Sequence, residues 1–163
     1  MEITTRNLNR FLMFKLPSAW LCGVRVKKLT DRICVTGVKH RWINQNPFNS
    51  LYFAVQAMAA ELSTGALVMA GIKKSGKNIS MLVAQNNSRF TKKATGRITF
   101  ECADGAVISE AIEKTVATGE GQTFWMKSVG LNEEGQEVSV FEFEWTIKLK
   151  SGRKKMVSAE SDM

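Results

Sequence analysis

The sequence predicts an α+β fold in which a strongly curved antiparallel sheet wraps around one apolar helix. Placed on a helix, residues 51–62 are apolar on nearly every side, with only Gln56 and Glu61 interrupting them. Two strands of unusual length, 33–43 and 137–150, each change the phase of their apolar alternation, as a β-bulge does. Because bulges bend strands, such a sheet could enclose the helix.

The N-terminal part supplies a short helix and the first long strand. Residues 4–15 place apolar side chains at helical spacing, and Pro17 ends that pattern. In 33–43 the alternation shifts at Gly37, which predicts the bulge there.

The central helix is expected over about 50–64. Asn49 or Ser50 suits its N-cap, and Gly65 is a typical C-terminal stop.

The remaining elements follow from alternation and from helical spacing. We expect strands at 66–72 and 79–84 joined by a hairpin turn at 73–78, a strand at 97–102, a second short helix over 107–116, and strands at 122–131 and 137–150.

Length and composition indicate one domain. The 163 residues, 44% of them hydrophobic and 9% aromatic, suffice for one core. We expect a single domain over 1–163 with its core at about 20–150 and a basic, flexible tail at 151–163. The formal charge of +8 predicts an anionic partner, which could be nucleic acid, a phosphorylated cofactor or an acidic lipid surface. Charge alone does not choose among these three.

No membrane span, secretory signal or metal site is expected. The longest apolar run, 51–60, is shorter than the roughly 20 residues that cross a bilayer, and Lys15 interrupts the apolar N-terminal segment. Three cysteines, Cys22, Cys34 and Cys102, are widely spaced and indicate buried reduced thiols in a cytoplasmic protein.

One stretch resembles the helix signature of the hot-dog-fold thioesterase superfamily. Asn46-Pro47-Phe48-Asn49-Ser50-Leu51-Tyr52, followed by Ala59-Ala60-Glu61-Leu62 and Gly65, is similar to a branch of thioesterases related to a family of unassigned function. The resemblance covers roughly 20–150. It implies a hot-dog fold and a homodimer, or a dimer of dimers, with helices side by side and acyl-CoA sites at the interface.

Two departures from the family pattern matter. Phe48-Asn49-Ser50 stands where the phenylacetyl-CoA thioesterase type has a His-Gly-Gly turn, and Glu61 lies about one turn beyond the family's acidic position. Dehydratases of this fold use a loop histidine, whereas His40 falls on the preceding strand, so a dehydratase is not expected.

Glu61 is the candidate general base. A carboxylate in an apolar site has a raised pKa and can take a proton from water near neutral pH. The alternative to a catalytic role is that Glu61 is partly solvated near the helix end or pairs with a lysine. On a helix starting at Asn49, Glu61 lies roughly 18 Å along the axis, so it would act in trans, across an antiparallel pair of helices.

Asn49 and Ser50 are the other candidate catalytic residues. As cap residues they would leave backbone N–H groups at the helix start, which could polarise a thioester carbonyl. Asn46 is a candidate substrate contact or simply a loop residue. Gln56 is a candidate substrate contact, although a hydrogen bond in the dimer seam explains it better.

Basic residues cluster after the strand at 79–84. In the resembling fold, this segment lies near the nucleotide end of coenzyme A, and a solvated basic loop is an equally good explanation. The candidate phosphate contacts are Arg89, Lys92, Lys93 and Arg97.

The segment 71–77 matches the spacing G-x-x-x-x-G-K of a phosphate-binding loop. Asn78 follows where Ser or Thr would bind magnesium, and a strand is expected next. A hairpin turn explains the segment better.

The expected function is hydrolysis of an acyl-CoA or acyl-carrier thioester. The alternative is a non-catalytic acyl-CoA or acyl-carrier binding protein of the same fold, and nucleic-acid binding comes third, on charge alone. No cofactor is expected beyond coenzyme A as part of the substrate.

Overall fold

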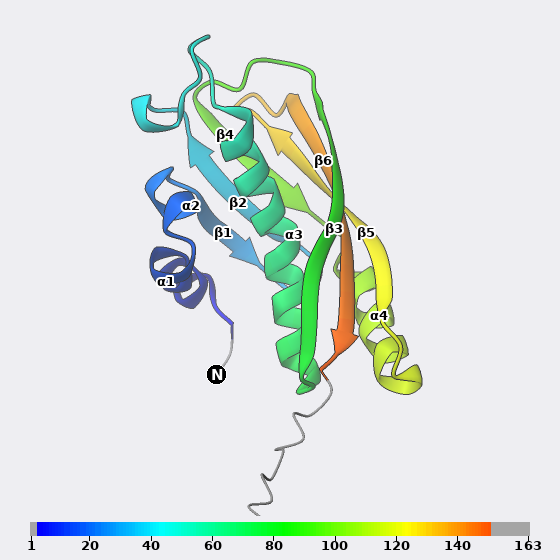
Figure 1. Ribbon diagram of the computed structural model, residues 1–163. Helices are drawn as coiled ribbons and strands as arrows, with labels where there is room; N and C mark the ends of the chain where they lie inside the picture. The colour runs from blue at the N-terminus through cyan, green and yellow to red at the C-terminus, as the bar shows by residue number, and fades with distance from the viewer. Residues whose placement is uncertain (1–2, 151–163) are drawn as a thin grey trace, which may run out of the picture.

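The chain forms an α+β domain in which one long helix lies against a curved sheet (Figure 1). The computed structural model describes residues 3–150, so the basic tail expected at 151–163 lies outside the described residues. In chain order the elements are α1 (Thr5–Lys15), α2 (Pro17–Leu21), β1 (Arg25–Leu29), β2 (Cys34–Lys39), η1 (Trp42–Asn44), α3 (Phe53–Ser75), β3 (Ile79–Phe90), β4 (Arg97–Cys102), α4 (Gly105–Thr118), β5 (Gln122–Leu131) and β6 (Glu137–Leu149).

The six strands form one antiparallel sheet in the order β1-β2-β4-β5-β6-β3. Its register shifts at Lys27 of β1, Ala84 of β3 and Val138 of β6, where one strand carries an extra residue. The bulge expected in the last strand is therefore confirmed, because Val138 and Ser139 are both buried. The bulge expected at Gly37 is wrong, since β2 pairs with β4 without a shift and the extra residue lies on β1.

The central helix α3 is longer than expected. It runs from Phe53 to Ser75 and ends at Gly76, which adopts the left-handed conformation (φ 66°). The strand expected at 66–72 is wrong, because a short continuous apolar run is compatible with either a helix or a strand. Gly65 is an internal position rather than a stop. A Cβ there would lie 3.2 Å from the Trp145 ring, so the small residue lets helix and sheet approach closely.

Several other boundaries correct the sequence predictions. The N-terminal helix is confirmed, and Pro17 opens a second short helix, α2, which the sequence did not suggest. The strand expected over 33–43 is shorter and gives way to the 3-10 turn η1. The helix after β4 is confirmed and ends at Gly119. Segment 71–77 consists of the end of α3 and the turn after it. It is therefore not a phosphate-binding loop, which would precede a helix.

Polar side chains fasten α3 to the sheet. The Thr36 hydroxyl donates to the Ala59 carbonyl at 2.7 Å, and the Ser63 hydroxyl donates to Ser128 Oγ at 2.8 Å. Trp145 Nε1 donates to Thr64 Oγ1 at 3.0 Å. Buried polar groups are costly without partners, so these bonds fix the position of the helix in the sheet.

Two buried thiols face each other across β2 and β4. Cys34 pairs in register with Cys102, and both are free, as is Cys22. Burial raises the pKa of Cys34 and of Cys102 to about 12. Both thiols therefore stay protonated and behave as core residues.

One described helix, α3, is long and apolar enough to cross a membrane by length and composition alone. Within its most apolar 18-residue window, 61% is buried inside the domain, as is usual for the core helix of a globular fold.

Gly105 offers a test of how α4 docks on the turn between β1 and β2. A Cβ at Gly105 would collide with the backbone of Asp31 and lie 2.5 Å from Arg32 Cα. We expect Gly105→Ala to lower the free energy of unfolding by about 1–3 kcal/mol, measured by urea denaturation. The control is Gly119→Asn, where a Cβ meets nothing within 4 Å and Asn tolerates the positive φ. Equal stability of Gly105→Ala and the unmodified chain would contradict this packing.

Candidate active site at the start of the central helix

The loop before α3 is organised by the side chain of Asn46. Its Oδ1 accepts from the N–H groups of Phe48 at 2.9 Å and Ser50 at 3.3 Å, and its Nδ2 donates to Ser50 Oγ at 3.0 Å. Asn49 sits at the tip with φ 56°, the only positive φ of a non-glycine residue in the described chain. Asn46 and Ser50 therefore hold a tight turn.

The helix starts later than the sequence predicted. Tyr52 is the N-cap and makes no side-chain cap bond, so Asn49 and Ser50 are loop residues and not caps. The loop is tied down instead through Leu51 N–H to the Ala94 carbonyl at 2.8 Å. Within residues 3–150 the N–H groups of Phe53 and Ala54 donate to no acceptor, so partial positive charge is available at this end of α3.

A cavity of about 430 Å³ opens beside this helix start. It brings together five of the residues singled out in the sequence, namely Asn46, Ser50, Gln56, Lys92 and Lys93. The rest of its lining is largely apolar and consists of Phe48, Leu51, Phe53, Phe90, Thr91 and Ala94. The cavity thus has an aromatic wall, a helix N-terminus and two lysines, a combination suited to an amphipathic ligand with an anionic end.

The aromatic wall was not predicted. Phe53 and Phe90 meet edge to face with their ring centroids 6.4 Å apart. Phe90 also meets Phe141 edge to face, with ring centroids 5.5 Å apart. Phe90 lies in a segment dominated by its basic residues, where no alternation marks an inward side chain. Only the pairing of β3 with β6 places its ring against Phe141.

Gln56 is fixed at the back of the cavity. It is buried, its Nε2 donates to the Leu51 carbonyl at 3.2 Å, and its Oε1 accepts from Ser139 Oγ at 2.9 Å. Both partners lie in the same chain. The amide therefore joins the loop, the helix and β6, which keeps the cavity in shape.

Glu61 lies about two turns along α3 from its first residue, Phe53, and is not part of the cavity lining. Its Oε1 would be 3.2 Å from a Cβ at Gly65, so the carboxyl rests against the glycine beside Trp145. No residue in 3–150 forms a hydrogen bond or ion pair with this carboxyl. Burial raises the pKa of Glu61, because the charged form loses water without gaining a partner.

Glu61 belongs to a partly open stripe of α3 in an otherwise buried helix. Ala54, Ala57 and Met58 share this stripe at helical spacing. The sheet covers the other sides of the helix, so this stripe is the side on which a further surface could approach.

Two of the four basic residues expected to meet phosphate line this cavity. Lys92 donates to Gln136 Oε1 at 2.9 Å and Lys93 to the Phe48 carbonyl at 3.3 Å, both near the cavity. Arg89 forms an exposed ion pair with Glu137 at 3.3 Å, and Arg97 lines a different cavity. Lys92 and Lys93 thus line the cavity at the helix start, whereas Arg89 and Arg97 each line a different hollow.

Among residues 3–150, His40 and the acidic side chains form no cluster suited to a metal ion. The described chain contains no group of three or more His, Cys, Asp and Glu residues that could hold a metal ion. His40 follows β2 and lines no part of the cavity, although its Nε2 is buried without a partner among the described residues.

The raised pKa of Glu61 gives a stability prediction. The folded chain holds this proton to a higher pH than the unfolded chain, so the free energy of unfolding falls as pH rises from about 4 through the raised pKa. We expect Glu61→Gln to be more stable than the unmodified chain at pH 7, with the difference vanishing near pH 4. Urea denaturation at both pH values measures it, with the exposed Glu113→Gln as the control. Lower stability of Glu61→Gln at pH 7 would contradict an unpartnered carboxyl.

Solved structures share this fold across almost the whole chain. A protein of unknown function from Pseudomonas aeruginosa, described as a probable thioesterase, has a TM-score of 0.78 at 20% identity and covers 92% of this chain and 99% of its own. A thioesterase from Haemophilus influenzae has a TM-score of 0.71 at 14% identity over 94% and 96%. A protein of unknown function from Chlorobaculum tepidum has a TM-score of 0.78 at 14% identity over 90% and 94%. The chain therefore has the hot-dog fold of thioesterase-like proteins.

No curated protein sequence matches the chain. The family described as a domain of unknown function, DUF4442, matches residues 4–147. Because that match spans nearly every described element, the chain belongs to the DUF4442 family.

Proposed function

We propose that the protein hydrolyses an acyl-CoA or acyl-carrier thioester in a site completed by a second copy of the chain. The observation that carries the proposal is the unpartnered carboxyl of Glu61 on the helix whose start opens into an aromatic cavity flanked by lysines. The thioesterase-like fold supports the same reaction class.

The cavity suits the two ends of such a substrate. The rings of Phe53 and Phe90 would contact an acyl chain, and the free N–H groups at the start of α3 would stabilise the oxyanion formed from the carbonyl. Lys92 and Lys93 stand at the rim and would meet the phosphates of the nucleotide. Glu61, with its raised pKa, would take a proton from the attacking water.

A second copy is required because Glu61 is too far from the helix start of its own chain. Eight residues separate Phe53 from Glu61, which is roughly 12 Å along the axis. Two α3 helices packed antiparallel along their open stripes would bring Glu61 of one copy toward the cavity of the other. The edge strand β3, twelve residues long, also needs a partner, because a long open edge invites pairing.

A non-catalytic acyl-CoA or acyl-carrier binding protein is the second candidate. The turn at Asn49 has its amides at Phe48 and Ser50 occupied by Asn46, so fewer donors face a carbonyl than the sequence suggested. Release of free thiol from a panel of acyl-CoA and acyl-carrier thioesters separates the two candidates. Tight binding without thiol release would identify the binding protein.

Subunit mixing tests the shared site. Glu61→Gln should keep ligand affinity and lose about 100-fold or more in turnover, because general-base catalysis is removed. Asn49→Pro should also be inactive, since proline cannot adopt φ 56°, whereas Asn49→Gly should retain activity. Mixing the two inactive variants should restore part of the thiol release through heterodimers with one intact site. Absence of any restoration, with heterodimers shown by native mass spectrometry, would contradict catalysis in trans.

The two lysines give a prediction about substrate recognition. We expect the double change Lys92→Gln and Lys93→Gln to raise KM for acyl-CoA several-fold and to leave acyl-pantetheine, which lacks the nucleotide, unchanged. The control is Arg89→Gln, because Arg89 is paired with Glu137. An equal loss for both thioesters would show that these lysines do not meet the phosphates.

A further inference from the structure

Among the described residues, the net positive charge is confined to residues 3–60. Residues 61–150 carry eleven basic and eleven acidic residues. Residues 3–60 carry one acidic residue, Asp31, and nine basic ones, which are Arg6, Arg10, Lys15, Arg25, Lys27, Lys28, Arg32, Lys39 and Arg41. Asp31 is already paired with Lys74 at 2.6 Å. None of the nine cations forms an ion pair with a described residue, so their charge is available to a partner.

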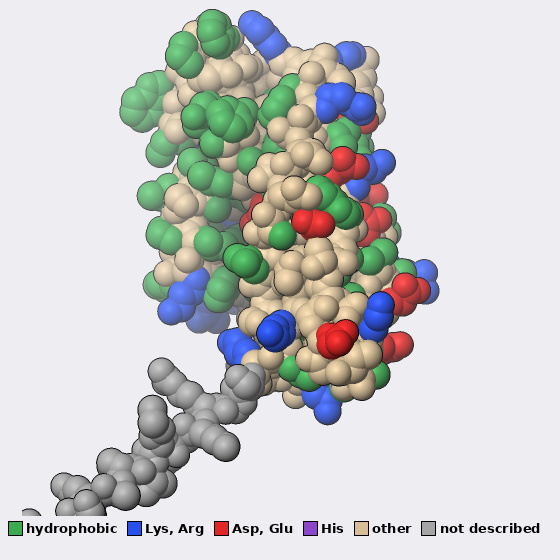
Figure 2. All heavy atoms as spheres, turned by 45° about the vertical axis from the view of Figure 1, so that its right-hand side comes forward, with side chains coloured by type: hydrophobic (Ala, Val, Ile, Leu, Met, Phe, Trp, Pro, Cys, Tyr) green, Lys and Arg blue, Asp and Glu red, His purple; other side chains and the backbone are tan. Residues whose placement is uncertain are grey.

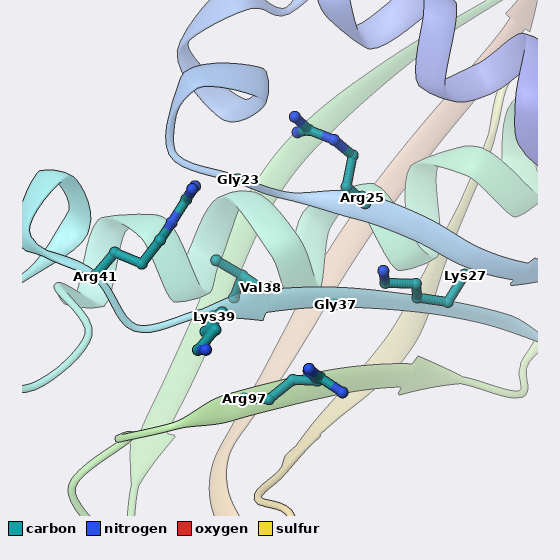
Figure 3. A pocket seen from close by; sticks show the side chains of 8 residues that line it. All are labelled: Gly23, Arg25, Lys27, Gly37, Val38, Lys39, Arg41 and Arg97. Atoms are coloured by element: carbon teal, nitrogen blue, oxygen red, sulfur yellow. The ribbon is translucent and has the colours of Figure 1, made fainter.

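Part of this charge lines a cavity of about 390 Å³ on the face of the sheet opposite α3 (Figure 3). Gly37 forms the floor, and the five cations of the lining are Arg25, Lys27, Lys39, Arg41 and Arg97. No acidic side chain lines it. Glu133 accepts from the backbone N–H of Arg97 at 3.3 Å, and the Arg97 guanidinium forms no ion pair with a described residue. Such a cluster of guanidinium and ammonium groups is suited to binding phosphate.

Two of the arginines are held in place at the rim. The guanidinium of Arg25 stacks 3.3 Å from the centre of the Trp20 ring and donates to the carbonyls of Trp20 and Val24. Arg41 packs its guanidinium directly over Gly23. Fixed donors lose little entropy when an anion arrives.

Large apolar side chains stand in solvent next to this charge. Within α1, α2 and η1, the most exposed are Phe14 (71%), Leu21 (63%), Trp42 (83%) and Ile43 (52%). The elements adjoin one another, because Asn44 of η1 donates to the Cys22 carbonyl at the end of α2 at 2.8 Å. In Figure 1, α1 and α2 lie together beside β1, and hydrophobic side chains gather along the left margin of the surface in Figure 2.

The exposed face of α1 carries both positive charge and an exposed apolar side chain. Leu8 and Leu12 point into the core, whereas Arg6, Arg10 and Phe14 follow one another at intervals of four residues on the outer face. A helix with one buried stripe normally presents polar residues outward, so the exposed aromatic ring has no role in the packing of the fold.

We propose that α1, α2 and η1 dock the protein onto an anionic lipid bilayer, with Trp42 and Phe14 entering the interface and the basic cavity receiving lipid headgroup phosphates. Aromatic and aliphatic side chains beside arginine and lysine are the composition that binds such interfaces. A second copy that docked through this same surface in an isologous contact would place its cations against the same cations of the first copy, which repel them. Nucleic acid would use the cations but would leave Leu21 and Ile43 exposed.

Vesicle flotation of the full chain tests the proposal. The protein should float with phosphatidylcholine vesicles that contain phosphatidylglycerol and stay in solution with pure phosphatidylcholine, and added salt should weaken binding. Changing Arg10→Gln and Arg41→Gln together should lower the partition coefficient about fivefold for each cation. The control is the double variant Lys114→Gln and Lys148→Gln, which removes the same charge from exposed positions of α4 and β6. Equal loss in both double variants, or no flotation at all, would overturn the proposal.

Fluorescence locates the contact. Brominated lipid should quench the protein's tryptophan emission, and Trp42→Phe should lower that quenching while Trp125→Phe, changed on β5, should leave it unchanged. Equal quenching in Trp42→Phe and in the unmodified chain would place the contact elsewhere. Binding of RNA or inorganic phosphate, without any quenching by brominated lipid, would likewise overturn the proposal of a lipid surface.

These outcomes are independent of the proposed hydrolysis. Thiol release from soluble short-chain acyl-CoA should be the same in the Arg10→Gln and Arg41→Gln double variant as in the unmodified chain, because neither residue lines the cavity at the start of α3. Sedimentation velocity of both double variants checks that the oligomeric state is unchanged. Dissociation caused by Arg10→Gln and Arg41→Gln would show that a second copy covers this surface instead.

Discussion

The burial of α3 inside the curved sheet is the constraint on which the rest of the structure depends. A helix apolar on nearly every side cannot stand at a surface, because about 25 cal/mol is lost for each Å² of apolar area left in water. The sheet can surround it only by bending, and the bulges at Ala84 and Val138 supply that bend. Gly65 then brings the helix close enough for Trp145 to pack on it.

Enclosure of the helix also decides the fate of each polar group on it. Gln56, Ser63 and Thr64 each find a partner on β5 or β6, so their polar atoms stabilise one position of the helix. Glu61 differs, because its carboxyl is partly buried and has no partner among the described residues. A group that weakens the fold in this way is expected at a functional site, where the raised pKa is useful.

The two faces of the sheet serve different purposes. The side occupied by α3 holds the aromatic cavity, whose amphipathic shape suits a thioester with a nucleotide. The opposite side, near β1 and β2, has five cations and no acidic side chain around Gly37, and α1, α2 and η1 expose apolar side chains beside them. Separation of the two sites would let the protein rest on a lipid surface while the helix start remains open to substrate.

The sequence by itself determined the fold class, the last two strands and the central helix, because long alternation and a helix apolar all round are local signals. It also identified Glu61 as the unusual residue, since a carboxylate among apolar neighbours is visible without coordinates. It placed the end of α3 eleven residues too early, because a continuous apolar run such as 66–72 has no polar face from which helix or strand could be told.

Only the tertiary structure decided which side chains meet. Phe90 joined the cavity, and Arg97 left the expected basic cluster for the opposite face, because strand register assigns each residue to one side of the sheet. The gathering of Arg25, Lys39 and Arg41 around one hollow depends on the pairing of β1 with β2, a contact between segments that show no common pattern in the sequence. Local periodicity fixes the elements, whereas the composition of a site depends on long-range pairing.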